Sequence, residues 1–341
     1  MRRRLLAACV LLCALVLAPS SAGKTQPSWD LPQIKAVVAA GLMGPNVATF
    51  HPNDPLTDAA LDQLVAGLTQ QPLAPSVSPT ATVTMAQLDA RLVDALGLDD
   101  AAAMFEQSAV IAGLAPPGRF GTEAVARLLG LRTNHPAAQD SLELLPGETA
   151  TRAEAAFSGA RILAFNGTEV PAVEDVSLSF TLPTLTTWQQ RILHTAVRFI
   201  GYPYIWGGES ETTQSPFGKQ VQGGFDCSGF VWRVYKIQKY AGEGNLASVL
   251  EGRTTYAMSG EVPRSKRIPF AKLQPADVIF FGSQGPKSKP SQVGHMGIYL
   301  GNGWFIHSSD YGVAVAQLTG WYRTSFAWAR RPLAEAGLAS S

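Results

Sequence analysis

One thiol and two imidazoles are the residues of this sequence that could do covalent chemistry together. Cys227 lies in residues 225–230, FDCSGF, directly after a pair of glycines. Apolar residues then recur three and four positions apart as far as Ile237, which predicts a helix with one buried face. Cys227 should therefore lie in the first helical turn, where unpaired N–H groups and the helix dipole lower a thiol pKa. A thiolate at this position could attack a carbonyl carbon, although a buried structural cysteine is the simpler alternative.

The N-terminus helps to decide between a catalytic and a structural role for Cys227. Residues 1–22 have the pattern of a secretory signal peptide, with three arginines, an apolar run over 5–17 and small residues at 20–22. The run is too short for a comfortable membrane span, and no later segment approaches that length. Lipidation at Cys9 is the less favoured alternative, because its motif lies at the start of the apolar run. We therefore expect a secreted protein, cell-wall-associated or extracellular.

Export would leave Cys227 as the only cysteine, because Cys9 and Cys13 lie within the signal peptide. A single cysteine forms no internal disulfide, and an unused thiol is a liability in an oxidising compartment. This favours a catalytic role for Cys227. Removal of the signal also leaves 24 basic side chains (27 minus 3) against 26 acidic ones. A net charge near −2 gives no reason to expect nucleic acid as a partner.

A catalytic thiol needs a base, and the base needs a third group that orients it. His295 and His307 lie in two predicted strands, 293–300 and 304–308, joined at Gly301-Asn302-Gly303. With a three-residue loop, His307 would face Gly297 and His295 would lie diagonally on the same face. A two-residue loop would put the two imidazoles on opposite faces. We assign His295 as the base and His307 as the orienting group.

Two other interpretations compete with this assignment. Either histidine taken alone could be a satisfied structural residue. A metal site could be formed by Asp226, Cys227 and the two histidines, but no Cys-x-x-Cys or His-Glu-x-x-His spacing supports it. We therefore expect no metal and no cofactor.

Residues 28–165 are rich in alanine and leucine, with helical periodicity broken by glycine and proline. A pattern occurs three times in which Thr57, Thr84 or Thr151 can cap a helix, which predicts an all-α repeat domain. The stretch resembles S-layer homology repeats, helical modules that hold exported bacterial proteins on secondary cell-wall polymers. Residues 151–154, TRAE, match best, whereas the first two copies lack the arginine that the family uses on its anionic ligand. A degenerate helical spacer is the alternative.

The remaining segments complete the predicted architecture. Residues 166–186 show no helical period and contain one glycine and two prolines, so we expect a linker. Thr187 and Gln190 have capping-box spacing, which predicts that a helix over 188–200 follows. Helices around Cys227 and consecutive antiparallel strands predict an α+β domain over 187–331. Residues 332–341 should form a flexible tail.

Several motifs in a fixed order make residues 187–331 similar to the NlpC-type cell-wall cysteine peptidases, which have a papain-like fold. The matching stretches are PYIWGG at 203–208, FDCSG at 225–229, LQPADVIFF at 273–281, GHMGIYLGNG at 294–303 and IHS at 306–308. Ala276 replaces a usual glycine, and the loop 209–224 is longer than is typical of the family.

The resemblance implies a role for each of several residues. It implies that Cys227, His295 and His307 are catalytic, and that Tyr204 lines the site near the oxyanion. Asp226 and Ser228 would contact the amino-terminal end of the substrate. Trp206 and Arg253 are further candidates for substrate binding.

The function implied is hydrolysis of amide bonds in peptidoglycan stem peptides, commonly between γ-D-glutamate and diaminopimelate or lysine. Two alternatives stay open. One is a cell-wall polymer-binding protein with a catalytically silent peptidase domain, and the other is an acyltransferase on the same fold.

Overall fold

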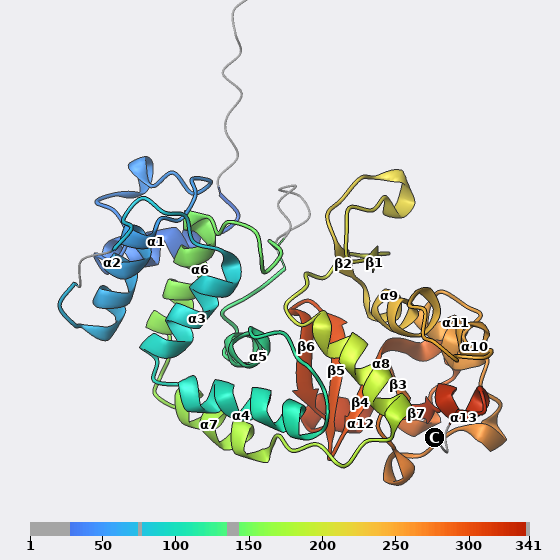
Figure 1. Ribbon diagram of the computed structural model, residues 1–341. Helices are drawn as coiled ribbons and strands as arrows, with labels where there is room; N and C mark the ends of the chain where they lie inside the picture. The colour runs from blue at the N-terminus through green and yellow to red at the C-terminus, as the bar shows by residue number, and fades with distance from the viewer. Residues whose placement is uncertain (1–27, 74–76, 135–142, 339–341) are drawn as a thin grey trace, which may run out of the picture.

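The computed structural model describes residues 28–73, 77–134 and 143–338. A helical half and a half built on a five-stranded sheet lie side by side (Figure 1). The predicted signal peptide lies outside the described residues. Among the residues that are described, no helix is long and apolar enough to cross a membrane.

The helical half is built around three chain segments that pair in a closed ring, residues 55–57, 82–84 and 149–151. Leu56 N donates to Ala150 O at 2.7 Å, Ala150 N donates to Val83 O at 2.8 Å, and Val83 N donates to Leu56 O at 3.0 Å. Each segment leads into a helix of the half. These helices and their neighbours are α1 (Leu31–Ala39), α2 (Asp58–Thr69), α3 (Met85–Ala95), α4 (Asp99–Ile111), α5 (Phe120–Leu128) and α6 (Arg152–Leu163).

The threonines of the predicted repeats cap these helices. Thr57, Thr84 and Thr151 each accept a hydrogen bond from the backbone N–H three residues on, at 3.3 Å, at the start of α2, α3 and α6. Such caps satisfy backbone donors that would otherwise have no intrahelical partner. The three repeats predicted from the sequence are therefore three equivalent helix starts around one ring.

Residues 166–186 are not the irregular linker that the sequence suggested. Helix α7 (Glu169–Ser179) forms there and packs on α4. Pro171 is compatible with it because a proline in the first turn removes no intrahelical hydrogen bond. The ring of the next residue, Phe180, lies 4.8 Å from that of Phe105 and 4.9 Å from that of Trp304, so the segment seals the junction between the halves.

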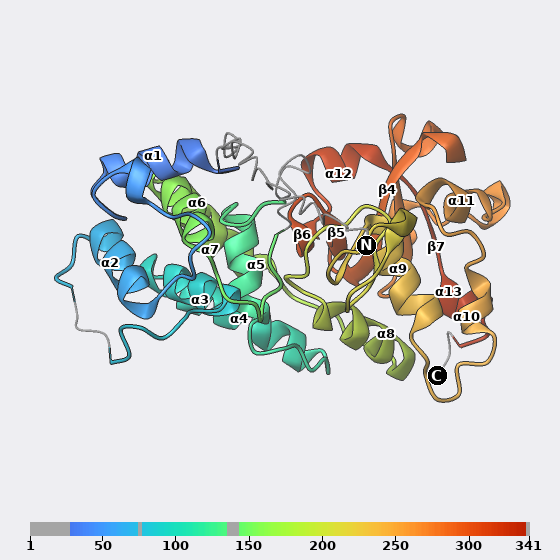
Figure 2. The ribbon, with the colours of Figure 1, turned by 90° about the horizontal axis from the view of Figure 1, so that it is seen from above.

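The second half holds an antiparallel sheet of order β6-β5-β4-β3-β7. Strand β3 (Val278–Gly282), which lies between β4 and β7, is buried along its whole length, in keeping with its apolar sequence VIFFG. In Figure 2 the helical half lies beside β6, and α9 (Cys227–Trp232) lies against β4 and β5 of the sheet. The strands are β3 (Val278–Gly282), β4 (Val293–Gly301), β5 (Trp304–Ser309), β6 (Gly312–Gln317) and β7 (Phe326–Arg330).

The other elements of this half surround the sheet. Two short strands pair antiparallel just before the cysteine helix, and a final helix shows that residues 332–335 are not part of a flexible tail. Leu333 of that helix is buried. These elements are α8 (Thr187–Arg198), β1 (Glu209–Ser210), β2 (Gly224–Phe225), α9 (Cys227–Trp232), α10 (Leu246–Val249), α11 (Thr255–Gly260), α12 (Gly320–Ser325) and α13 (Pro332–Glu335).

Helix α8 begins one residue earlier than the sequence indicated. Its capping box is formed by Thr186 and Gln189: Gln189 N donates to Thr186 Oγ1 at 3.3 Å, and Thr186 N donates to Gln189 Oε1 at 2.9 Å. The neighbouring pair Thr187 and Gln190 has the same spacing and residue types. Spacing alone could not distinguish the two registers.

A buried ion network fastens the helical half to the sheet. Arg127 of α5 pairs with Glu123 at 3.3 Å and with Glu143 at 2.8 Å. The same guanidinium donates to the carbonyls of Gly201, at 2.8 Å, and Tyr311. Gly201 lies just before the motif that contains Tyr204, and Tyr311 lies just before β6. The hydrophobic core also runs through both halves without a break.

Candidate active site

Cys227 is the first residue of α9, as the sequence predicted. Asp226 caps the helix, with its Oδ1 accepting from Gly229 N at 2.5 Å and from Ser228 Oγ at 3.0 Å. Gly229 must be glycine because a Cβ there would lie 1.8 Å from Gly208 O. This close approach of the PYIWGG segment to α9 places Cys227 at the floor of a cleft.

The thiol does not have the lowered pKa that its helical position suggested. Burial raises the pKa of Cys227, and the Asp226 carboxylate raises it further. The Ser228 N–H, the Met296 backbone and the Thr255 hydroxyl act in the opposite direction but are outweighed. The first turn of a six-residue helix is too weak a source of potential to offset the loss of hydration. In the absence of substrate, Cys227 is therefore a neutral thiol at neutral pH.

Thr255 is a contact of the nucleophile that sequence reasoning missed. Its Oγ1 lies 3.3 Å from Cys227 Sγ, and both side chains are buried. Thr254 caps α11 by accepting from Ala257 N at 3.3 Å, which puts Thr255 in the first turn beside the thiol. The only sequence signal was that residues 253–256 could open a short helix.

The two histidines meet on one face of the β4–β5 hairpin. His295 Nε2 and His307 Nδ1 are 2.8 Å apart, so one nitrogen of each ring is used in this hydrogen bond. Nδ1 of His295 is the nitrogen left to exchange a proton with a thiol. The pairing Ile298↔Ile306 and Tyr299↔Phe305 is the register expected for a three-residue loop, in which both imidazoles share a face.

That register arises in a way the sequence did not show. The strands leave only Asn302 and Gly303 between them, which by itself would put the imidazoles on opposite faces. An irregularity between Tyr299 and Gly301 adds one residue to β4 and restores the productive register.

Aromatic rings surround the histidine pair and keep it neutral. The Phe305 ring stacks 4.7 Å from that of His307, and Phe281 stacks 5.7 Å from His295. Burial lowers the pKa of His295 to about 4 and that of His307 well below its ordinary value, with His295 adding to the second shift. Tyr322 OH lies 3.4 Å from His307 Nε2, a contact not predicted from the sequence.

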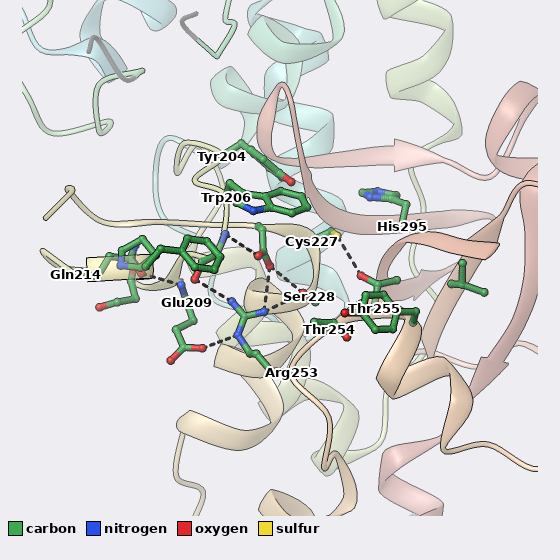
Figure 3. A pocket seen from close by; sticks show the side chains of 18 of the residues that line it. Tyr204, Trp206, Glu209, Gln214, Cys227, Ser228, Arg253, Thr254, Thr255 and His295 are labelled. Atoms are coloured by element: carbon green, nitrogen blue, oxygen red, sulfur yellow. Dashed lines mark hydrogen bonds and ion pairs between the residues drawn. The ribbon is translucent and has the colours of Figure 1, made fainter. Parts of the chain in front are cut away.

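The cleft above the thiol has a volume of about 860 Å³. It brings together every predicted site residue except one: His307, 2% exposed, lies behind His295 and supports it without reaching the cleft. Figure 3 shows Cys227 and His295 at one end of this space and Gln214 at the other. The predicted residues that line it are Tyr204, Trp206, Asp226, Cys227, Ser228, Arg253 and His295.

Arg253 holds the cleft together through five hydrogen bonds. Nε donates to Glu209 at 2.6 Å, and NH1 donates to Asp226 at 3.2 Å and to Ser228 at 2.8 Å. NH2 donates to the carbonyls of Gly207 at 3.1 Å and Gly208 at 3.2 Å. The guanidinium thus ties α9 to the PYIWGG segment and to β1, and it balances the Asp226 charge.

Tyr204 presents a protonated hydroxyl. Burial raises the pKa of its phenol, and the neighbouring Cys227 and Asp226 add to the shift. A phenol that keeps its proton is a hydrogen-bond donor at any physiological pH. Among the described residues, no group of three or more His, Cys, Asp or Glu side chains is placed to hold a metal ion.

Comparison with known proteins shows that the site lies in a part of the chain that matches a known family. Residues 201–331 match the sequence model of the NlpC/P60 family. The chain is 30% identical over 128 residues to a gamma-D-glutamyl-L-lysine dipeptidyl-peptidase of Bacillus subtilis (strain 168), covering 38% of this chain and 34% of that protein. It is 33% identical over 132 residues to the probable peptidoglycan endopeptidase LytE of the same organism, covering 39% and 30%. The chain thus spans about a third of the length of these two curated relatives.

Among solved structures, an NlpC/P60 family protein from Bacillus cereus ATCC 10987 shares 29% identity, over 46% of this chain and 43% of that one, with a TM-score of 0.32. The residues that match the family model are the ones that form the antiparallel sheet and α9. Residues 201–331 are therefore an NlpC/P60 domain with a papain-like fold.

Proposed function

We propose that this protein is a secreted peptidoglycan hydrolase that cleaves amide bonds in stem peptides by a Cys-His-His mechanism. The observation that carries the proposal is the hydrogen-bonded pair of His295 and His307 beside a cleft whose floor holds Cys227. A buried thiol, a base and a group that orients the base are the parts that acyl transfer to sulfur requires.

In the first step the Cys227 sulfur attacks the scissile carbonyl carbon while its proton passes to His295 Nδ1. Both groups start neutral, so the transfer accompanies the attack and no ion pair has to form beforehand. The Cys227 N–H and the Tyr204 hydroxyl donate to the oxyanion. His307 holds the ring of His295 and stabilises the imidazolium that forms.

The tetrahedral adduct then collapses. The C–N bond breaks, the leaving amine takes the proton from His295, and a thioester remains on Cys227. Water attacks this thioester with His295 as the base, the C–S bond breaks, and the thiol regains its proton. The proposed scissile bond joins γ-D-glutamate to diaminopimelate or lysine.

Mass spectrometry of defined stem peptides tests the proposal. In water enriched in ¹⁸O, hydrolysis adds the heavy oxygen to the new carboxylate and exposes a new amine. An acyltransferase would give a product that carries a second amine and no ¹⁸O. A Cys227→Ala variant should be inactive. Binding without any cleavage by the parent would instead favour a silent peptidase domain.

We propose as a second role that residues 28–165 bind a secondary cell-wall polymer. Its support is the three-segment ring together with Arg152, which follows the third capping threonine. The Arg152 guanidinium lies 4.7 Å from the Phe50 ring centroid and donates to Phe50 O at 2.8 Å. Sedimentation of the Cys227→Ala protein with purified wall polymer, with and without Arg152→Gln, tests this role. Equal sedimentation of the two variants would contradict it.

A further inference from the structure

Two exposed aromatic rings that the mechanism does not use line the cleft. Trp206 is 72% exposed and Phe217 is 83% exposed, and both line the cleft. Phe217 belongs to the loop 209–224, the part of the chain that is longer than the family pattern. Large apolar rings left in water beside a binding cleft mark a surface that a ligand covers.

Hydrogen bonds within the loop that contains Phe217 fix its conformation. Gln214 accepts from Glu209 N at 2.8 Å and donates to three carbonyls of the loop, that of Gly224 at 2.8 Å among them. Gln214 also pairs with Val221 across the loop. The Phe217 ring rests on Gly207, where a Cβ would lie 2.6 Å from Phe217 Cε2. Phe217 thus lies against the glycine that directly follows Trp206 in the chain.

The position of the base fixes the direction in which a substrate would lie. His295 protonates the leaving amine, so the amine side of the scissile bond must lie at the His295 end. The acyl side then runs from Cys227 past Arg253 toward Glu209 and Gln214 (Figure 3). In a stem peptide the acyl side leads to the amino-terminal residue, whose nitrogen is joined to the lactyl group of an N-acetylated sugar.

We propose that Trp206 and Phe217 form a subsite for the N-acetylated sugar that carries the stem peptide. Sugar rings present C–H faces that cover an aromatic ring well, and their hydroxyl and amide groups would meet the polar side chains of the loop. The subsite rests on the proposed function and specifies its substrate: stem peptides still attached to the glycan. Binding energy from this remote group would accelerate cleavage at Cys227.

Two substrates that differ only in the sugar test the subsite. One is a stem peptide attached to N-acetylmuramic acid, and the other is the same peptide with a plain N-acetyl cap, which keeps the amide and removes the sugar. The parent should cleave the first with about tenfold higher kcat/KM, the effect of covering part of one aromatic ring. Phe217→Ala should bring the ratio close to one.

Trp321 provides a matched control, since it is 60% exposed and does not line the cleft. Trp321→Ala should keep the tenfold ratio. A parent ratio of one, or a Phe217→Ala ratio equal to that of the parent, overturns the subsite.

Binding to the Cys227→Ala protein, measured by calorimetry with the same two ligands, tests the subsite without turnover. Tighter binding of the sugar-bearing peptide, abolished by Phe217→Ala, supports the subsite even if no hydrolysis is found. Equal dissociation constants overturn it even if the parent is an active hydrolase. The failure of the subsite and the failure of the proposed function are therefore distinguishable.

Discussion

Removing the hydroxyl of Thr255 should raise the pKa of the Cys227 thiol. Valine has nearly the same shape as threonine, so Thr255→Val deletes the 3.3 Å contact with Sγ and leaves the packing close to intact. The hydroxyl lowers the thiol pKa in the parent because it can donate to a thiolate. Without it, the buried thiolate loses one of its few polar partners.

The size of the effect follows from the hydrogen bond. A bond to a charged group contributes about 1.5 to 3 kcal/mol. At about 1.4 kcal/mol per pKa unit, the thiol pKa should rise by about one to two units. At a fixed pH below the pKa, the thiolate fraction should fall at least about tenfold.

Alkylation by iodoacetamide as a function of pH measures this directly. The signal is clean because Cys227 is the one cysteine outside residues 1–22. Peptide mapping by mass spectrometry follows the modification, and Thr255→Ser, which keeps the hydroxyl, is the control. A Thr255→Val profile whose midpoint coincides with that of the parent or of the serine variant would refute the reasoning.

Three further predictions concern the junction and the histidine pair. Arg127→Met removes the ion pair of the buried Glu123 and leaves Glu143 with Arg132 alone, so it should cost about 3 to 5 kcal/mol of unfolding free energy in guanidinium titrations. Arg91→Met, at a half-exposed ion pair, should cost at most about 1 kcal/mol, and equal losses would contradict the buried network. Burial lowers the pKa of His295 to about 4, and the base must be neutral to accept a proton. The value of kcat/KM should therefore fall as the pH drops through about 4. An acid limb of the pH profile centred near 6.5 would contradict this. His307→Ala should lower kcat about a hundredfold while His307→Asn retains more activity, and identical rates for the two variants would exclude an orienting role.

Local signals in the sequence were enough to place the parts of the site. Asp226 is a typical cap, the glycines around it mark close backbone contacts, and the first turn of α9 follows from both. The sequence also permitted the observed register of the histidine hairpin, as one of two alternatives. The extra residue in β4 that produces it was not, because a bulge depends on how the strand bends over the core.

Properties set by burial could not be predicted from the local sequence. The helix start favours a thiolate, but the desolvation of Cys227 depends on the neighbouring strands and on α11, which are distant in the chain. The same limitation explains why Thr255 was missed. A contact between two residues that lie 28 positions apart produces no pattern in the spacing of neighbouring residues.

The segment 166–186 was mistaken for a linker because glycine and proline, which interrupt a helix, also occur where a helix begins. Gly167 has φ +91° and ends the preceding element, and Pro171 lies in the first turn of α7. Whether the segment is a tether or a packed helix is decided by the aromatic contacts of Phe180, which join residues far apart in the sequence.

The most direct test of the central claim is the rate at which the purified protein releases a new amine from a defined stem peptide, compared with the Cys227→Ala variant. We predict that the parent releases one amine for each new carboxylate, passes through a thioester on the peptide that contains Cys227, and loses all turnover on substitution. Cleavage by Cys227→Ala at the parental rate would contradict the account.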